Sequence, residues 1–346
     1  MRGKAKLLFG SLITVLVAVI ITATGMGYIN ISAADVITTL WQTLFDQPGL
    51  SDAAVNTTNS VIIMDVRLPR ILVAALVGGG LALAGGIFQA ILLNPLADPY
   101  TLGISSGAAF GASTAFILSI IGISLPVSYF VPFFAFIGAV TTLGAVFYLS
   151  SDDPQLSSNT LILSGVIVAA ILSAGIGFIK YMADEEVGVI IFWLMGSFIG
   201  KSWHDAGLLL LILAPCLLFC CYYARDLNIM ALGTTTADTL GVDSAKIRRQ
   251  LLISASLITA ICVAVSGVIG FVGLIVPHML RMITGPDNRI LLPASFLAGS
   301  ILLLVADTVT RAILPHEIPI GVLTALIGGP FFCYIFRKRQ LGRGYA

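Results

Sequence analysis

Long apolar stretches separated by short polar segments occupy almost the whole chain. A helix needs about 20 apolar residues to cross the hydrocarbon core of a bilayer. Ten stretches approach or exceed that length, at residues 7–29, 62–92, 101–122, 127–149, 160–180, 206–223, 250–268, 270–284, 290–313 and 318–336. The pattern predicts an all-α integral membrane protein whose single domain, residues 1–346, contains ten transmembrane helices.

Two apolar stretches need separate treatment. The run from Leu251 to Leu280 is too long for one span, so it should break and leave a short second helix. The residues that mark the break are Gly267, Gly270, Gly273 and Pro277. The stretch 188–200 is too short to cross, which indicates an interfacial or re-entrant helix.

Composition supports a membrane protein and excludes other classes. Hydrophobic residues make up 58% and charged residues 10% of the chain, whereas soluble domains carry about 25% charged residues. A net charge of +1 excludes a nucleic-acid binder held by bulk charge. The five cysteines lie in apolar runs without CxxC spacing, so we expect no disulfide framework, metal site or bound cofactor.

The distribution of positive charge predicts the orientation. Basic residues precede the first apolar run and follow the last, which favours two cytoplasmic termini and an even number of spans. Residues 30–60 then form an outer loop and residues 224–249 a cytoplasmic loop. The first run also resembles a signal peptide that would be cleaved near Thr22-Ala23-Thr24-Gly25. We expect it to be retained, because its loss would leave nine spans between two positive flanks.

Five basic residues fall on the predicted outer side and are exceptions to the charge bias: Arg67, Arg70, Lys180, Lys201 and Arg311. An acidic partner protein would need exposed cations of this kind for steering and register. Snorkelling of long side chains at the interface is the simpler alternative.

Two patterns suggest enzyme chemistry. The run Gly103-Ile104-Ser105-Ser106-Gly107 has the GxSxG spacing of a nucleophile elbow, and Ser105 with His278 could form an intramembrane serine hydrolase. Small residues that allow close helix packing explain the same run more simply. The run from Met195 to Ser202 lacks the first glycine of a phosphate-binding loop, so any ATP would bind another chain.

Ion-coupled secondary transport has little support in the spans. Such transporters keep ionisable residues deep in the membrane, and the best candidate here is Asp307 near the outer end of a span. Arg311 lies four residues later, and a helical Asp–Arg pair accounts for both residues.

Three motifs resemble the FecCD-type permease family, the transmembrane subunits of bacterial ABC importers for iron–siderophores, haem and cobalamin. Listed in chain order, they are Arg67-Leu68-Pro69-Arg70 with Asn94-Pro95-Leu96-Ala97-Asp98-Pro99 and Leu102 to Ala108, then Gly267 to His278 with Arg281, then Leu314 to Val322 with Gly328-Gly329-Pro330. The resemblance covers residues 61–337, and the first 60 residues carry no comparable motif.

The resemblance implies a type II ABC importer permease in the bacterial cytoplasmic membrane. It implies dimerisation around a central pathway, two separate ATPase subunits that bind ATP and Mg²⁺ on the cytoplasmic face, and an external substrate-binding protein. We expect an iron chelate, a ferric siderophore or haem, as substrate, with cobalamin as the alternative. The resemblance leaves pairing with itself or with a related subunit open.

The resemblance also gives roles to particular positions. Arg67, Arg70 and Arg311 match the arginines that meet acidic residues of the binding protein. Asn94, Leu96, Ser157 and Ser158 match the cytoplasmic gate, although Asn and Ser also cap loops commonly.

The cytoplasmic loop should form two short helices that contact the ATPase. Asp226 or Asn228 is a suitable N-cap, and Gly233 and Gly241 are suitable left-handed C-terminal positions. Three apolar residues have no evident core within the chain: Met230, Leu232 and Leu240. A groove on an ATPase would bury them, and the alternative is an amphipathic helix lying on lipid.

Overall fold

A computed structural model describes residues 2–27, 29–45, 57–123, 126–153, 155–312 and 316–343, and every regular element within these ranges is a helix. Within them, seven helices are long and apolar enough to cross a membrane, and three shorter apolar helices lie at Ile104–Ile120, Val272–Thr284 and Ile320–Tyr334. The prediction of ten spans in an all-helical membrane protein is confirmed. The spanning helices are α1 (Arg2–Gly25), α4 (Leu68–Ile91), α5 (Ile104–Ile120), α6 (Val127–Leu149), α7 (Ser158–Ala183), α9 (Trp203–Tyr222), α12 (Ser244–Ser266), α13 (Val272–Thr284), α14 (Asn288–Ala312) and α15 (Ile320–Arg343).

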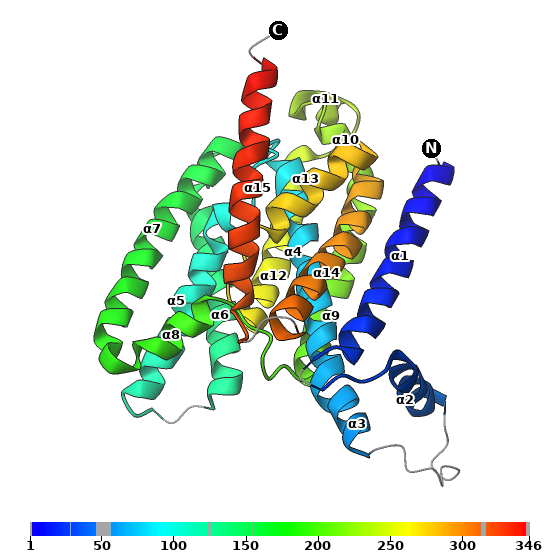
Figure 1. Cartoon of the computed structure of the whole chain (residues 1–346). Helices are drawn as coiled ribbons and strands as arrows, with labels where there is room; N and C mark the ends of the chain where they lie inside the picture. Colours follow the sequence, from blue (N-terminus) through cyan, green and yellow to red (C-terminus); the bar gives the residue numbers. More distant parts are fainter. Residues whose placement is uncertain are drawn as a thin grey trace.

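The ends of the molecule agree with the predicted orientation. The start of α1 and the end of α15 lie at the same end as α10 (Ala224–Met230) and α11 (Thr234–Thr239), whereas α2 (Ala33–Phe45) and α3 (Thr57–Val61) lie at the opposite end (Figure 1). Residues 46–56 of the predicted outer loop, and Leu314 and Pro315 of the third motif, lie outside the described residues.

Helix α4 is the centre of the fold. It packs against α9, α12, α13 and α14, and 89% of its apolar window is buried, against 11% for the peripheral α1. Glycines permit the close approach: a Cβ on Gly78 would lie 2.3 Å from the carbonyl oxygen of Gly299, and one on Gly85 would lie 1.9 Å from that of Gly273. These glycines serve close helix packing, as expected in lipid.

A second group consists of α5, α6 and α7, which α12 joins to the α4 group. The GxSxG run contributes to this packing. A Cβ on Gly107 would lie 2.4 Å from the carbonyl oxygen of Gly138, and one on Gly111 would lie 2.0 Å from that of Phe134. Small residues therefore bring the backbones of α5 and α6 into contact.

The long apolar run breaks where its glycines predict. Helix α12 ends at Ser266, Gly267 has φ +73°, and α13 is a separate helix of 13 residues. Pro277 lies inside α13 and does not mark the break itself. The short helix in the stretch 188–200 is α8 (Val187–Leu194).

The segment after α8 connects α12 to α15. The Ser197 amide donates to the Ser266 carbonyl at 2.8 Å, and the Gly321 amide donates to the Met195 carbonyl at 3.0 Å. The near match to a phosphate-binding loop is thus a packed connector between two spans.

Candidate functional site

The outer arginines follow a local irregularity at the start of α4. Residues Ile62–Arg67 form a π-helix, and Pro69 follows in the first turn of α4. Proline cannot donate a backbone hydrogen bond and clashes with the carbonyl four residues earlier, which a wider turn relieves. The irregular turn ends at Arg67, so this side chain and Arg70, one turn later, both enter the outer end of the helix bundle.

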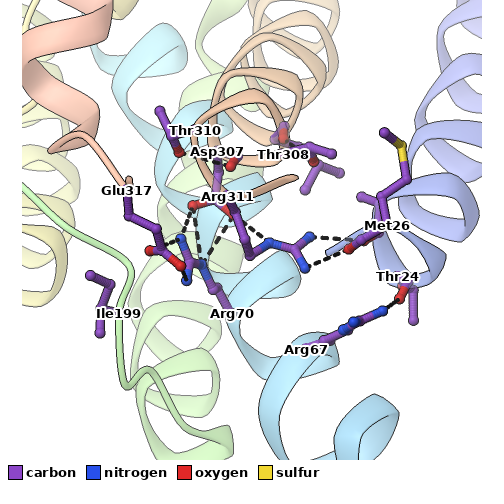
Figure 2. A network of polar contacts seen from close by, with 12 residues as sticks. Thr24, Met26, Arg67, Arg70, Ile199, Asp307, Thr308, Thr310, Arg311 and Glu317 are labelled. Atoms are coloured by element: carbon purple, nitrogen blue, oxygen red, sulfur yellow. Dashed lines mark hydrogen bonds and ion pairs between the residues drawn. The ribbon is translucent and has the colours of Figure 1, made fainter. Parts of the chain in front are cut away.

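Arg67 and Arg311 bind the outer end of α1 (Figure 2). Arg67 donates to the carbonyls of Thr24 at 2.7 Å and Gly25 at 3.0 Å, and also to Ile29. Arg311 donates to the carbonyls of Ala23 at 2.8 Å and Met26 at 2.7 Å. The last carbonyls of a helix have no intrahelical donor and carry partial negative charge. The two cations, which are far apart in the sequence, therefore both cap the end of α1.

Arg70 forms a second part of the cluster. Its guanidinium bonds Asp307 on α14 at 2.8 Å and Glu317 at 3.0 Å (Figure 2). The Asp307 side chain is 1% exposed and that of Glu317 is 37% exposed. Asp307 also lies 3.9 Å from Arg311, in the helical spacing predicted for this pair. One buried carboxylate thus lies between two guanidinium groups.

The expectation that the outer arginines form an exposed ring is wrong for this chain. Arg67 is 6% exposed, and the side chains of Arg70 and Arg311 are 12% and 8% exposed. Burial of a cation requires hydrogen-bonded or charged partners, and the end of α1, Asp307 and Glu317 supply them. Docking of a partner at Arg67, Arg70 and Arg311 stays a prediction, now for cations that already have internal partners.

The predicted coupling segment forms the two expected short helices, α10 and α11, at the cytoplasmic end. Leu232 is 67% exposed and Leu240 is 61% exposed. Gly233 has φ +105° and Gly241 has φ +84°, positive values that glycine adopts readily after a helix. Met230 is 4% exposed, so the expectation that it faces a partner is wrong.

The predicted N-caps of α10 are also wrong. Tyr223 occupies that position, while Asp226 lies in the first turn and Asn228 lies within α10. Asn228 instead joins the coupling segment to the start of α14: its side-chain Oδ1 accepts from the Asn288 backbone amide at 2.9 Å, and its side-chain Nδ2 donates to the Asp287 carboxylate at 2.7 Å. Hydrogen bonds from Arg289 and then Asn228 lower the pKa of Asp287 to about 2.

The predicted gate residues lie in the loop after α4 and at the start of α7. The Asn94 side-chain Oδ1 accepts from the Leu96 backbone amide at 3.0 Å within its own loop. Ser157 is the N-cap of α7, and Ser158 is the first residue of that helix. Hydrogen bonds from Ser157 and Thr160 lower the pKa of Asp153, in the same loop, to about 2. The loop-capping role is therefore visible, and the gate stays a prediction.

The hydrolase alternative has no support in the site geometry. Ser105 lies on α5, which packs against α6 and α7, whereas His278 lies on α13, which packs against α4 and α14. Among the described residues, no protein group is hydrogen-bonded to the buried Ser105 hydroxyl. Since a nucleophilic serine needs a base within hydrogen-bond reach, nothing in this arrangement activates Ser105.

These features define the class of protein first. Ten apolar helices in one bundle, with two exposed leucines at the ends of short helices at the cytoplasmic end, are the features of a multi-pass transport protein driven from inside. The family model of the FecCD transport family matches residues 15–338. The chain belongs to this family of ABC importer permeases.

Two relatives and one solved structure illustrate the likeness. The cobalamin import system permease protein BtuC of Halobacterium salinarum is 42% identical over 82% of this chain and 75% of its own length. The hemin transport system permease protein HmuU of Yersinia pestis is 36% identical over 99% of both chains. A transporter assigned to the metal-chelate ABC type, in an inward-facing conformation, has a TM-score of 0.81 and 34% identity over 96% of this chain and 99% of its own.

Family membership fixes several properties. The chain is a transmembrane subunit of the cytoplasmic membrane and not an enzyme, and ATP binds a partner ATPase in the importer complex. The intramembrane hydrolase and the ion-coupled secondary transporter are thereby excluded. The fold prediction, an all-helical importer permease, is confirmed by the match to the metal-chelate transporter.

Proposed function

We propose that this permease imports an iron chelate, either a ferric siderophore or haem, as one half of a homodimeric pathway. Relatives named for cobalamin and for hemin support a large metal–organic cargo. The composition of two spans agrees with this: residues 158–179 of α7 and 320–336 of α15 contain no charged side chain. A surface of apolar and hydroxyl-bearing side chains without charge binds a bulky chelate weakly. An external binding protein would therefore select the substrate.

The observation that carries the mechanism is the exposure of Leu232 and Leu240 at the ends of two short helices whose residues Leu227, Met230 and Ala237 are buried. An apolar side chain left in water at a cytoplasmic surface is a docking element for a groove on a partner. We assign this contact to the ATPase, with Met230, Gly233 and Gly241 shaping the helices from within. ATP-driven movement of the segment then opens and closes a gate at Asn94, Leu96, Ser157 and Ser158.

The external binding protein should dock at the outer arginine cluster. Of the three cations, Arg70 has the most accessible partner, Glu317, for which an acidic residue of the binding protein can substitute. Arg70→Glu should weaken binding-protein-stimulated ATP hydrolysis, with partial rescue by a basic residue on the partner. Stimulation at the wild-type level would remove Arg70 from the docking site.

Uptake into proteoliposomes that contain the permease and its ATPase tests the substrate. The binding protein is added outside with a labelled ferric siderophore, haem or cobalamin. The proposal expects ATP-dependent accumulation of a ferric chelate or haem that excess cobalamin does not compete.

The similarity to an archaeal cobalamin permease makes cobalamin the second candidate. Accumulation of cobalamin alone would establish that candidate instead. ATP hydrolysis without accumulation of any chelate would contradict the proposal of a metal–organic cargo.

Crosslinking tests the gate. Cysteines placed at positions 96 and 158 should form a disulfide across the dimer and block uptake, and reduction should restore it. Uptake that continues after complete crosslinking would exclude a gate at these positions.

A further inference from the structure

One buried cation at the cytoplasmic end is held by backbone carbonyls. Arg248 lies one turn into α12 and is 7% exposed, yet it takes part in none of the ion pairs formed by the described residues. Its guanidinium donates instead to the carbonyls of Gln155 at 2.9 Å and Leu156 at 3.1 Å, more than 90 residues earlier in the chain. The next residue, Arg249, is exposed. Two adjacent arginines thus have opposite environments.

The two carbonyls belong to the loop that leads into α7. Leu156 lies between them with φ +48°, a left-handed conformation that a leucine adopts rarely and only where its surroundings enforce it. The leucine side chain is buried. Arg248 therefore holds the peptide groups on both sides of a strained residue.

This loop sets the position of α7. The Asp153 carboxylate accepts from the Ser157 amide at 2.9 Å and from the Thr160 hydroxyl at 3.0 Å, and Ser157 is the N-cap of α7. A displacement of the Gln155–Leu156 peptides would therefore move the first turn of α7, which carries Ser157 and Ser158.

The other end of this connection is the coupling segment. The Val242 amide donates to the Ala237 carbonyl at 3.0 Å, and the Ser244 amide donates to the Asp238 carboxylate at 3.1 Å. Ala237 and Ser244 are both buried. Helix α11 and the first turn of α12 thus form one unit, and Arg248 follows directly after that turn.

We propose that Arg248 is the positioning residue that transmits movement of the coupling helices to the start of α7 and hence to the inner gate. This inference rests on the proposed function, in which an ATPase moves α10 and α11. The guanidinium suits the task because it is permanently charged and its donors form a rigid fork. A lysine would keep the charge with a single flexible ammonium group.

The test uses the complete permease–ATPase complex with Arg248→Gln and, as a matched control, Arg249→Gln. Spin labels at the exposed residues Thr235 and Asn159 report the distance between the coupling helices and α7. With Arg248 intact, the distribution of this distance should be narrow, and its mean should be the same in the nucleotide-free and ATP-bound states. In Arg248→Gln the distribution should broaden, or its mean should change when ATP binds. In Arg249→Gln the distribution should stay narrow.

Transport supplies the second readout. Substrate carried per ATP hydrolysed should fall about tenfold in Arg248→Gln, within the range usual for coupling between two sites, with a twofold change at most in Arg249→Gln. Arg248→Lys should be intermediate, and it replaces Arg248→Gln if that variant does not assemble.

The inference would be overturned if Arg248→Gln kept a narrow distance distribution that ATP does not change and also kept normal transport per ATP hydrolysed. The distances are measured without substrate, so they decide the role of Arg248 even if the chelate proposal fails.

Discussion

The outer arginine cluster and the cytoplasmic coupling segment both contain residues of an unexpected type for their location. The outer cluster has positive charges on the outer side, and the coupling segment has apolar side chains at an aqueous surface. The outer cations have internal partners: α1 carbonyls for Arg67 and Arg311, and two carboxylates for Arg70. The exposed leucines at positions 232 and 240 have none in a groove of this chain. A residue that looks misplaced in the sequence is thus stronger evidence for a partner protein where the fold leaves it without a partner inside the chain.

The largest effect should come from substitution of an exposed leucine in the cytoplasmic coupling segment. Leu240→Asp should lower transport at least tenfold, because an interface hot spot contributes about 2 kcal/mol or more to binding. Stability of the permease itself should change by no more than about 0.5 kcal/mol, as for other surface substitutions. Binding of the ATPase and uptake, measured together, check this. The matched control is Thr239→Asp, which places the same charge on the neighbouring exposed residue.

Substitutions in the outer arginine cluster should lower the free energy of unfolding. Asp307→Asn removes the carboxylate shared by Arg70 and Arg311, and breaking a buried ion pair costs about 3–5 kcal/mol. Glu317→Gln removes the partly exposed partner of Arg70 and should cost about 1 kcal/mol or less. Denaturant unfolding in detergent measures both. Equal losses for the two variants would contradict the distinction between a buried and an exchangeable carboxylate.

The smallest effect concerns the junction of the coupling segment with α14. The pKa of Asp287 is lowered to about 2, from an ordinary value of about 4. A depressed carboxyl pKa stabilises the fold above the ordinary value, and this contribution is lost as the pH falls through about 2. The melting temperature should therefore fall more steeply below pH 4 in the wild type than in Asp287→Asn, by no more than about 2 °C. Parallel curves would show that Asp287 does not support the junction.

The sequence predicts the topology well for a physical reason. Each span must satisfy its own backbone in lipid, so length and hydropathy alone locate the helices. The break between α12 and α13 follows equally well from its glycines. The short amphipathic helix α2 within the outer segment is not predicted from the sequence, because 13 residues are too few to cross the membrane and the surrounding residues 30–60 are predicted as a loop.

The candidate site is only partly predictable because its partners are distant in sequence. Arg67 and Arg311 bind backbone carbonyls at the end of α1, and a backbone carbonyl leaves no mark in the sequence. The contacts of Arg248 and Asn228 are not predicted either, because their partners lie in distant parts of the chain. The spacing of Asp307 and Arg311 was the one available signal, and it identified a real pair. Met230 was misplaced because an apolar residue in a loop segment can face either way.

Labelling of a cysteine introduced at Leu240 tests the central claim most directly. A membrane-impermeant maleimide is applied to inside-out and right-side-out vesicles, with and without the ATPase, and wild-type vesicles give the background from the native cysteines. The account predicts labelling from the cytoplasmic side alone and protection when the ATPase is bound. Labelling from the outside, or equal labelling with and without the ATPase, would contradict it.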